Sequence, residues 1–245
     1  MELMNLINSY GDRFVPVFIR VATMLTFIPF VGSTATPIFV RIGIMLALTF
    51  LLLPIVQVQT VNMVHAVFES AFIGMAIGLC ARLILGAVEM AAQWISIEMG
   101  IGVAAVFNPQ FGEVLGPLSL FYSFAAMGLF VALDMHYFFI EGIARSFSVT
   151  TVQYQGMFDA VLKLNGFFFP LAFQIAAPIF LIQILVNLGM GFLSRAMPQA
   201  NIFFVSFPLL ITAGIVSIII SLGLSFMVVT KGFSHIRDAI AAFTR

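Results

Sequence analysis

Five long stretches of this sequence contain no Asp, Glu, Lys or Arg, and no other feature limits the possible folds so strongly. These charge-free stretches are Val21–Val40, Ile42–Phe68, Val114–Leu133, Leu164–Ser194 and Ala196–Thr230. A helix needs about 20 predominantly apolar residues to cross the hydrocarbon core of a bilayer, and each stretch is long enough for that. The sequence therefore predicts an all-α membrane protein.

The overall composition excludes an ordinary soluble domain. Hydrophobic residues make up 62% of the chain and charged residues 8%, whereas a soluble domain has about 50% and about 25%. Lipid or other apolar subunits must therefore cover much of the surface. Ten basic and ten acidic side chains give a formal net charge of zero, so no basic field indicates nucleic acid as a partner.

Proline and glycine residues divide the apolar stretches into helices. The expected helices are an N-terminal one ending near Phe30, then Ile38–Val56, Val64–Ile97, Leu118–Leu133, Tyr137–Phe147, Leu164–Leu193 and Ile202–Lys231. We expect a loop at Ser148–Gly156, because that segment is polar and rich in β-branched residues. The fold class is thus a set of tilted helices and helical hairpins.

Two of the charge-free stretches exceed a plain membrane span. Leu164–Ser194 has 31 residues. That length corresponds to roughly 46 Å of helix against a hydrocarbon core of about 30 Å. Tilting or kinking absorbs some of the excess. A helix that is buried against protein outside the bilayer is the other interpretation.

A stripe of polar and small residues follows one face of the expected helix Val64–Ile97 and its extension. At 100° per residue the members from Arg82 onward fall within about 40° of one line. The stripe consists of Gly74, Gly78, Arg82, Gly86, Glu89, Gln93, Ser96 and Gly100. A charge facing lipid costs several kcal/mol, so the stripe must face other helices or water. A packing seam with a GxxxG pair and a water-filled path lined by Glu89 and Gln93 both fit.

Glycine and proline crowd the segment Phe107–Pro117, which predicts irregular backbone rather than helix. Lipid cannot satisfy such backbone, so within a membrane this segment must be buried in protein or line a cavity. A connecting loop outside the membrane and a re-entrant gate both remain open, and apolar side chains suit a gate that excludes water. The candidate plug residues are Phe107, Asn108, Pro109, Phe111, Gly112, Val114, Leu115, Gly116 and Pro117.

The sequence offers no arrangement for catalysis. Asp134, His136 and Glu141 form a tight acid–histidine group, but on a helix Asp134 and His136 point about 200° apart and cannot converge on one metal. HExxH, GxSxG and phosphate-loop motifs do not occur in the sequence. The single cysteine, Cys80, lies in an apolar run where a buried, inert thiol is expected. We therefore expect no enzyme activity, no metal and no cofactor.

The most distinctive motif lies between the last two expected helices. Gly189–Phe203 reads Gly-Met-Gly-Phe-Leu-Ser-Arg-Ala-Met-Pro-Gln-Ala-Asn-Ile-Phe, and its arginine is the only charge between Lys163 and Lys231. Two apolar helices joined by this turn predict a hairpin with a polar tip, although a surface loop with a snorkelling arginine also fits. The candidate tip residues are Arg195, Pro198, Gln199 and Asn201.

This motif, Gly191–Phe203 followed by Phe207–Leu209, resembles the signature of the FliR family of flagellar and type III secretion export gates. A second match is Ala92–Pro109, with a Met-Gly pair and a small-residue run that ends in Asn-Pro. A third is Leu129–His136, and Arg41–Ile44 is a short local match. The likeness in length and hydrophobic outline extends over nearly the whole chain.

The resemblance implies a single copy in a helical export gate with P-type (FliP) and Q-type (FliQ) subunits and an attached B-type subunit (FlhB). Residues 1–160 are expected to resemble a P subunit, and residues 161–245 a Q-subunit hairpin. The family's plug loop falls on residues 107–117, beside a ring of methionines from the P subunits. The hairpin tip is expected near the cytoplasmic entrance of the pore. In such an assembly much of the chain lies outside the bilayer plane.

We therefore expect a non-enzymatic core subunit of the bacterial flagellar or type III protein export gate, which forms part of the pore for unfolded substrates. Its expected location is the inner membrane, in the flagellar basal body. Basic residues dominate the tail, where Lys231, Arg237 and Arg245 oppose Asp238, and this predicts a cytoplasmic C-terminus. The alternative is a small-molecule or ion transporter subunit with a polar relay along the stripe. An intramembrane enzyme would need a nucleophile–base pair that the sequence does not supply.

Overall fold

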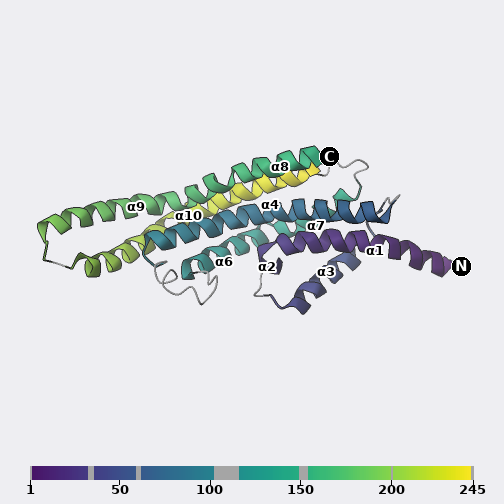
Figure 1. Cartoon of the computed structure of the whole chain (residues 1–245), viewed down its shortest axis with the longest axis horizontal. Helices are drawn as coiled ribbons and strands as arrows, with labels where there is room; N and C mark the ends of the chain where they lie inside the picture. The colour runs from purple at the N-terminus through teal and green to yellow at the C-terminus, as the bar shows by residue number, and fades with distance from the viewer. Residues whose placement is uncertain are drawn as a thin grey trace. The chain divides into compact units, whose positions relative to one another are not determined.

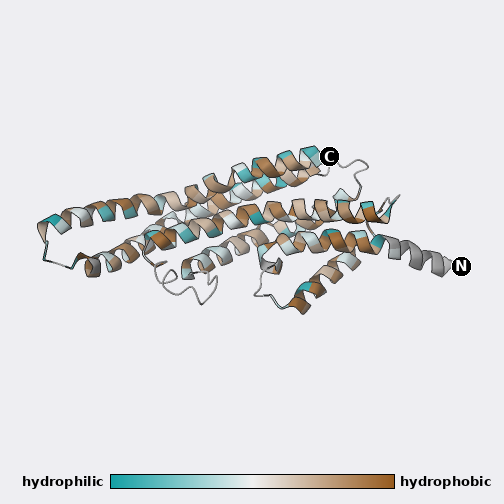
Figure 2. Ribbon diagram, in the orientation of Figure 1, coloured by the Kyte–Doolittle hydropathy of each residue, from teal (hydrophilic) through white to brown (hydrophobic). Residues whose placement is uncertain are grey.

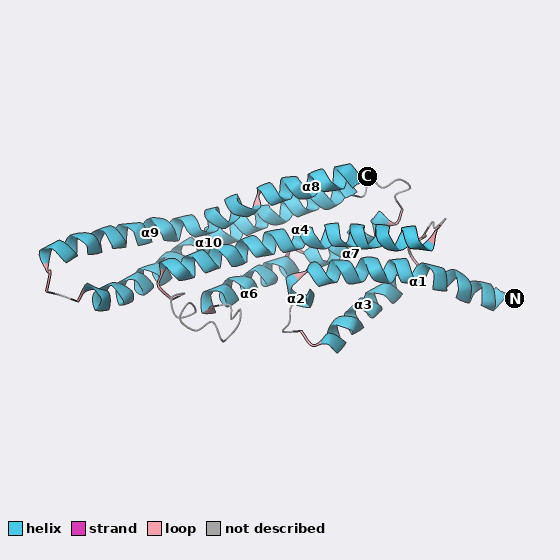
Figure 3. Cartoon of the chain, viewed as in Figure 1, coloured by secondary structure: helices cyan, strands magenta, loops and turns pink. Residues whose placement is uncertain are grey.

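The computed structural model describes residues 2–32, 36–58, 62–101, 116–148, 154–199 and 201–243. Helices dominate these ranges, and no strand occurs within them (Figure 3). The helices, labelled in Figure 1, are α1 Glu2–Phe27, α2 Pro29–Gly32, α3 Ile38–Leu52, α4 Met63–Glu98, α6 Pro117–Ala132, α7 Met135–Ser146, α8 Tyr154–Gly166, α9 Phe168–Ala196 and α10 Ile202–Phe243.

Within the described residues, three helical segments are long and apolar enough to cross a membrane. They are Met63–Glu98, Tyr154–Ala196 and Phe204–Ala241, with 36, 43 and 38 residues. A fourth crossing results if α6 and α7 form one broken span. The prediction of an all-α membrane protein is confirmed, and so is the continuation of α4 from Val64 to Ile97 as one helix.

Two amphipathic helical segments differ from the sequence prediction. Residues 154–156 were predicted to be loop, but α8 begins at Tyr154 and buries Met157 and Leu164. The last helix was predicted to end at Lys231, but α10 continues to Phe243. Its last turns bury Phe233, Ile236, Ala239, Ile240 and Phe243 at helical spacing. A search for charge-free stretches misses such segments, because their polar face carries the charges.

Turn chemistry explains two boundaries in the first and middle parts of the chain. The segment Ile38–Val56 was predicted as one helix, but α3 ends at Leu52, because Pro54 has no backbone N–H to continue the helical hydrogen bonds. Between α6 and α7, Asp134 has a positive φ of 54°. A short polar side chain tolerates this left-handed conformation better than most residues.

The chain forms two compact units, which are described separately. Unit 1 comprises Met1–Ile84, Leu133–Gly166 and Phe233–Arg245, and unit 2 comprises Leu85–Ala132 and Phe167–Gly232. The largest fully buried side chains of unit 1 are Met24, Ile77, Ile84, Met135, Phe139, Ile143, Phe233 and Ile236, and those of unit 2 are Ile95, Met99, Ile175 and Ile179. Each core thus combines segments that are far apart in the sequence.

Helices α1 and α4 approach closely in unit 1 because two glycines of α4 lie at the contact. A Cβ added at Gly74 would collide with Thr23 Oγ1 and with the Arg20 carbonyl. A Cβ at Gly78 would lie 2.5 Å from the Met24 carbonyl oxygen. Small residues at this spacing allow two helix backbones to pack directly against each other.

Gly78→Leu should force α1 and α4 apart, since overpacking of a tight contact costs about 1–3 kcal/mol. We expect a lower yield of folded chain and a lower melting temperature in detergent, measured by fluorescence-detected size exclusion after heating. Gly128→Leu is the matched control, because a Cβ at Gly128 meets nothing within 4 Å. Equal behaviour of the two variants would contradict the close contact.

Candidate functional site

A buried arginine joins three helices of unit 1. Arg20 of α1 is 3% exposed. Its Nη1 donates a hydrogen bond to Ser146 Oγ at 2.9 Å, and its Nη2 donates one to Ser70 Oγ at 3.3 Å. Nη2 also lies 3.7 Å from Glu69 Oε1. We call this group the Arg20 junction, and it links α1 to α4 and α7.

The Arg20 junction has an aromatic cover. The Arg20 Cζ lies 3.7 Å from the centre of the Phe147 ring, a contact worth about 2 kcal/mol when it is desolvated. Ser146 Oγ in turn donates to the Ile143 carbonyl at 2.7 Å. Burial lowers the pKa of Arg20 to about 10, an effect that the Glu69 carboxylate opposes. The guanidinium is therefore still charged at neutral pH.

The acidic partner of Arg20 is at the edge of the junction. The Glu69 side chain is 24% exposed, and its Oε2 lies 3.5 Å from Nδ1 of the exposed His65. Water and His65 can therefore interact with the Glu69 carboxylate, whereas the buried guanidinium of Arg20 depends on its protein partners. Its Nε has no hydrogen-bond partner among the described residues. Removing one partner of a buried charge pair is costly, because the other charge stays buried.

Reasoning from the sequence missed the Arg20 junction. A usable signal was present, since Arg20 is the only charged residue between Arg13 and Arg41. A lone charge in an apolar run needs a partner, and Glu69 is the first acid of the following apolar helix. The close contacts of Gly74 with the Arg20 carbonyl place α1 and α4 side by side at this point.

The predicted stripe runs along α4 as far as Ser96, and Gly100 lies just beyond the helix end. Gly74, Gly78 and Ser96 are buried, and Gly86, Glu89 and Gly100 are half-buried, whereas Arg82 and Gln93 are exposed. The structure thus places the two upstream glycines in a helix contact. It leaves two polar side chains of the stripe on the surface of this apolar helix.

The described residues on either side of the stretch that contains the proposed plug, up to 101 and from 116, lie near the end of α4, in unit 2. Gly100 terminates the helix with a φ of 77°, a conformation that glycine adopts without strain. Beyond the loop, a Cβ added at Gly116 would lie 3.5 Å from Ser96 Oγ. Residues 107–115 of the candidate plug lie outside the described residues. Of that set the structure places Gly116 and Pro117, at the start of α6.

The hairpin of α9 and α10 carries the candidate tip residues, all of which are exposed: Arg195, Pro198, Gln199 and Asn201. Figure 2 shows hydrophilic residues at this turn. Arg195 lies in the last turn of α9, where a positive charge is favoured by the helix dipole. Deeper in the hairpin, the fully buried Gln183 donates from Nε2 to the Leu210 carbonyl at 2.9 Å.

An aromatic cleft lies between α4 and α9 in unit 2. It has a volume of about 290 Å³ and is lined by Trp94, Ile97, Glu98, Phe173 and Phe180. The ring centres of Trp94 and Phe180 are 6.4 Å apart, and those of Phe173 and Phe180 are 6.1 Å apart. One carboxylate among aromatic rings supplies no nucleophile and no acid–base pair, so this cleft is a packing surface rather than a catalytic site.

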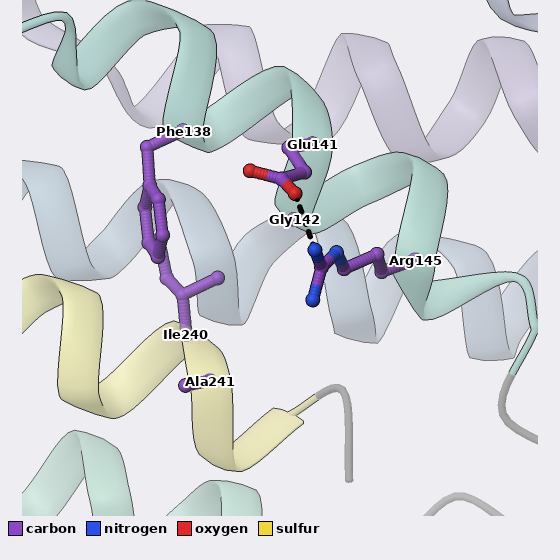
Figure 4. A pocket seen from close by; sticks show the side chains of 6 residues that line it. All are labelled: Phe138, Glu141, Gly142, Arg145, Ile240 and Ala241. Carbon is purple, nitrogen blue, oxygen red and sulfur yellow. Dashed lines mark ion pairs between the residues drawn. The ribbon is translucent and has the colours of Figure 1, made fainter.

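A smaller cleft of about 100 Å³ lies between α7 and the end of α10 in unit 1 (Figure 4). Glu141 and Arg145 form an ion pair at its edge, with 2.6 Å between Oε1 and Nη2. Ile240 packs close to Gly142, where an added Cβ would lie 2.7 Å from its Cγ2. The exposed pair contributes no more than about 1 kcal/mol. The cleft therefore shows helix packing and no reactive group.

The described residues contain no group of three or more His, Cys, Asp or Glu that could hold a metal ion. Cys80 is a free, buried thiol, as expected. The polar side chains that do converge, at Arg20 and at Gln183, tie helices together. The class of protein defined by these features is a multi-pass helical membrane protein whose polar residues organise helices.

Comparison with known proteins specifies the class further. The family described as "Bacterial export proteins, family 1" matches residues 12–236, and the chain belongs to that family. It is 29% identical to the flagellar biosynthetic protein FliR of Bacillus subtilis (strain 168), over 94% of this chain and 94% of that protein. FliR of Pectobacterium carotovorum subsp. carotovorum is 27% identical over 97% of this chain and 94% of its own length. FliR of Caulobacter vibrioides is 29% identical over 91% and 93%. The resemblance to the FliR family is thereby confirmed.

Arg20→Ala should destabilise the chain by about 3 kcal/mol, the low end of the range for a broken buried pair, because Glu69 is partly solvated. Arg20→Lys keeps the charge but cannot reach Ser146 and Ser70 together, so an intermediate loss is expected. Thermal unfolding in detergent measures both. The matched control is Arg145→Ala, which removes an exposed ion pair and should cost no more than about 1 kcal/mol. Equal melting temperatures for Arg20→Ala and Arg145→Ala would contradict the role of the junction.

Proposed function

We propose that the chain is a non-enzymatic core subunit of the flagellar protein export gate in the bacterial inner membrane. The observation that carries this proposal is the family match over residues 12–236, together with FliR relatives that align over more than nine-tenths of the chain. The similarity to these relatives indicates that the chain is a subunit of the flagellar export apparatus. A structural role also agrees with polar side chains that join helices instead of forming a reactive site.

The surface of the chain supports an assembly with other subunits. Arg82 and Gln93 are exposed on α4, a helix apolar enough to span a membrane. A charge on the lipid-facing side of a span is costly, so a neighbouring protein or water must face it. We propose that P-type (FliP) and Q-type (FliQ) subunits, with a B-type subunit (FlhB) alongside, provide this cover. Residues 1–160 would then take the P-like part and residues 161–245 the Q-like hairpin.

The segment 107–117 is proposed as the plug that closes the pore to ions when no unfolded substrate displaces it. The segment follows α4 in the chain, and its Gly116 lies beside Ser96 near the end of that helix. A loop with anchored ends can be displaced and can return to the same place. Its apolar side chains, including Phe107 and Phe111, would keep a narrow passage free of water until a substrate displaces them.

The exposed tip of the hairpin is proposed to face the cytoplasmic entrance of the pore. Arg195 is the only charged residue between Lys163 and Lys231 in the sequence, and it is exposed at the end of α9. An exposed arginine with five donors is suited to a carboxylate or to backbone carbonyls of a neighbouring subunit.

Replacing residues 107–115 by a Gly/Ser linker of equal length should make the assembled gate leak ions, because the apolar plug is lost while its anchors stay. Ion flux into vesicles or single-channel conductance measures the leak. The control is the same exchange at residues 149–153, between α7 and α8, which should leave conductance low. An unchanged conductance in the 107–115 variant would remove the plug assignment.

Arg195→Glu should lower secretion about tenfold relative to Arg195→Lys, the effect of roughly 1.4 kcal/mol in an interfacial equilibrium. The reversed charge loses a partner and also opposes the helix dipole at the end of α9. Secretion of flagellar protein into the medium measures the difference, with complex yield as the parallel readout. Equal secretion by the two variants would argue against a specific contact at the tip.

A further inference from the structure

The aromatic cleft of unit 2 contains a carboxylate without a partner. Glu98 lines this cleft together with Trp94, Ile97, Phe173 and Phe180. It forms no ion pair and no hydrogen bond with any residue that the structure describes. Glu98 is half-buried, and it belongs to a helix that is apolar enough to span a membrane. A charge in such surroundings needs a counter-charge or water.

Three features of the cleft favour a cation. The first is the carboxylate itself. The second is its position, because Glu98 is the last residue of α4 and no basic residue lies in the last turn, so the negative end of the helix dipole adds to the carboxylate. The third is the aromatic lining, since the faces of aromatic rings are electron-rich and attract cations. All three give the cleft a potential of the same sign.

The size and openness of the cleft suit a single side chain. Ile97 and Phe173 are 54% and 56% exposed, so the cleft is accessible from outside the chain. Its volume of about 290 Å³ is near the lower limit for small-molecule pockets, about 300 Å³. The rings of Trp94 and Phe180 are tilted by 36°, and those of Phe173 and Phe180 by 63°. The three rings therefore form a continuous aromatic wall without stacking flat on one another.

The chain itself does not provide the cation among its described residues. All lysines and arginines except Arg245 lie in the described ranges, and none of these pairs with Glu98. The stretch 102–115, which follows α4 almost directly, contains neither lysine nor arginine. We therefore expect the counter-charge of Glu98 to come from a neighbouring molecule.

We propose that the aromatic cleft receives a basic side chain, arginine or lysine, from an apolar helix of a neighbouring export-gate subunit. This inference rests on the proposed function, because that function supplies the neighbour. A guanidinium stacks on aromatic rings and binds a carboxylate at the same time, so arginine fits the cleft best. The simpler account leaves Glu98 to water at the end of α4. That account gives no role to the three aromatic rings that line the same cleft.

Photo-crosslinking in the assembled complex identifies the occupant of the cleft. Ile97 is replaced by the photoreactive amino acid benzoylphenylalanine, because its exposed side chain lines the cleft and carries no charge. Cells are irradiated, the complex is purified in mild detergent, and crosslinked peptides are identified by mass spectrometry. We expect adducts with another subunit, at a peptide with a lysine or arginine within one helical turn of the attachment point. Adducts only with lipid, only with this chain or only with peptides that lack a basic residue would overturn the proposal.

Charge exchange tests the pair without the bulky crosslinker. Glu98→Arg should lower the yield of assembled complex several-fold, because it places two cations in one cleft. Replacing the crosslinked basic residue by Glu in the same cells should restore the yield, which a misfolded chain would not do. Asp159→Arg is the matched control, because Asp159 is exposed on α8 and lies outside the cleft; its yield should stay unchanged.

The aromatic contribution is tested at Trp94. Trp94→Phe keeps a ring and should retain most of the yield, whereas Trp94→Leu should lower it several-fold. Normal yields for both Glu98→Arg and Trp94→Leu, in a complex that still contains P- and Q-type subunits, would overturn the cleft proposal and leave the export function intact. Absence of those subunits from the wild-type complex would overturn the proposed function, and this inference with it.

Discussion

This structure depends on one constraint, the free-energy cost of burying polar side chains without partners in a chain that is 62% hydrophobic. Neither a core nor a bilayer accepts a charge or an unpaired amide without partners. In unit 1 the guanidinium of Arg20 satisfies this constraint by binding Ser70, Ser146 and Glu69. In unit 2 the Nε2 of Gln183 does so across the hairpin, on the Leu210 carbonyl, whereas its buried Oε1 has no partner among the described residues. Each polar group therefore fixes which helices lie side by side, a specificity that apolar contacts alone would not give.

The same constraint acts outward, on the surface of the chain. Arg82, Gln93 and Arg195 are exposed on or beside helices that are long and apolar enough to span a membrane. Lipid is a poor environment for all three side chains. Segments of 36 to 43 residues also exceed what a bilayer core of about 30 Å requires. Both features are explained if neighbouring export subunits surround this chain, as family membership supports.

Periodicity and charge were sufficient to predict the helical class, the course of α4 and the hairpin, because long apolar helices depend on local patterns. The end of α10 and the start of α8 were predicted incorrectly, since their apolar residues recur at helical spacing between charges. The Arg20 junction could not be derived, because Ser70 and Ser146 are 50 and 126 residues away and only the fold brings them together.

The claim that other subunits enclose this chain is tested most directly by its mass after gentle extraction. The chain is solubilised in mild detergent from cells that secrete normally, and native mass spectrometry identifies what accompanies it. We predict a large hetero-oligomer that contains P- and Q-type subunits and that loses its integrity when those partners are absent. Recovery of the chain as a stable monomer or homo-oligomer, from cells with intact secretion, would contradict the account.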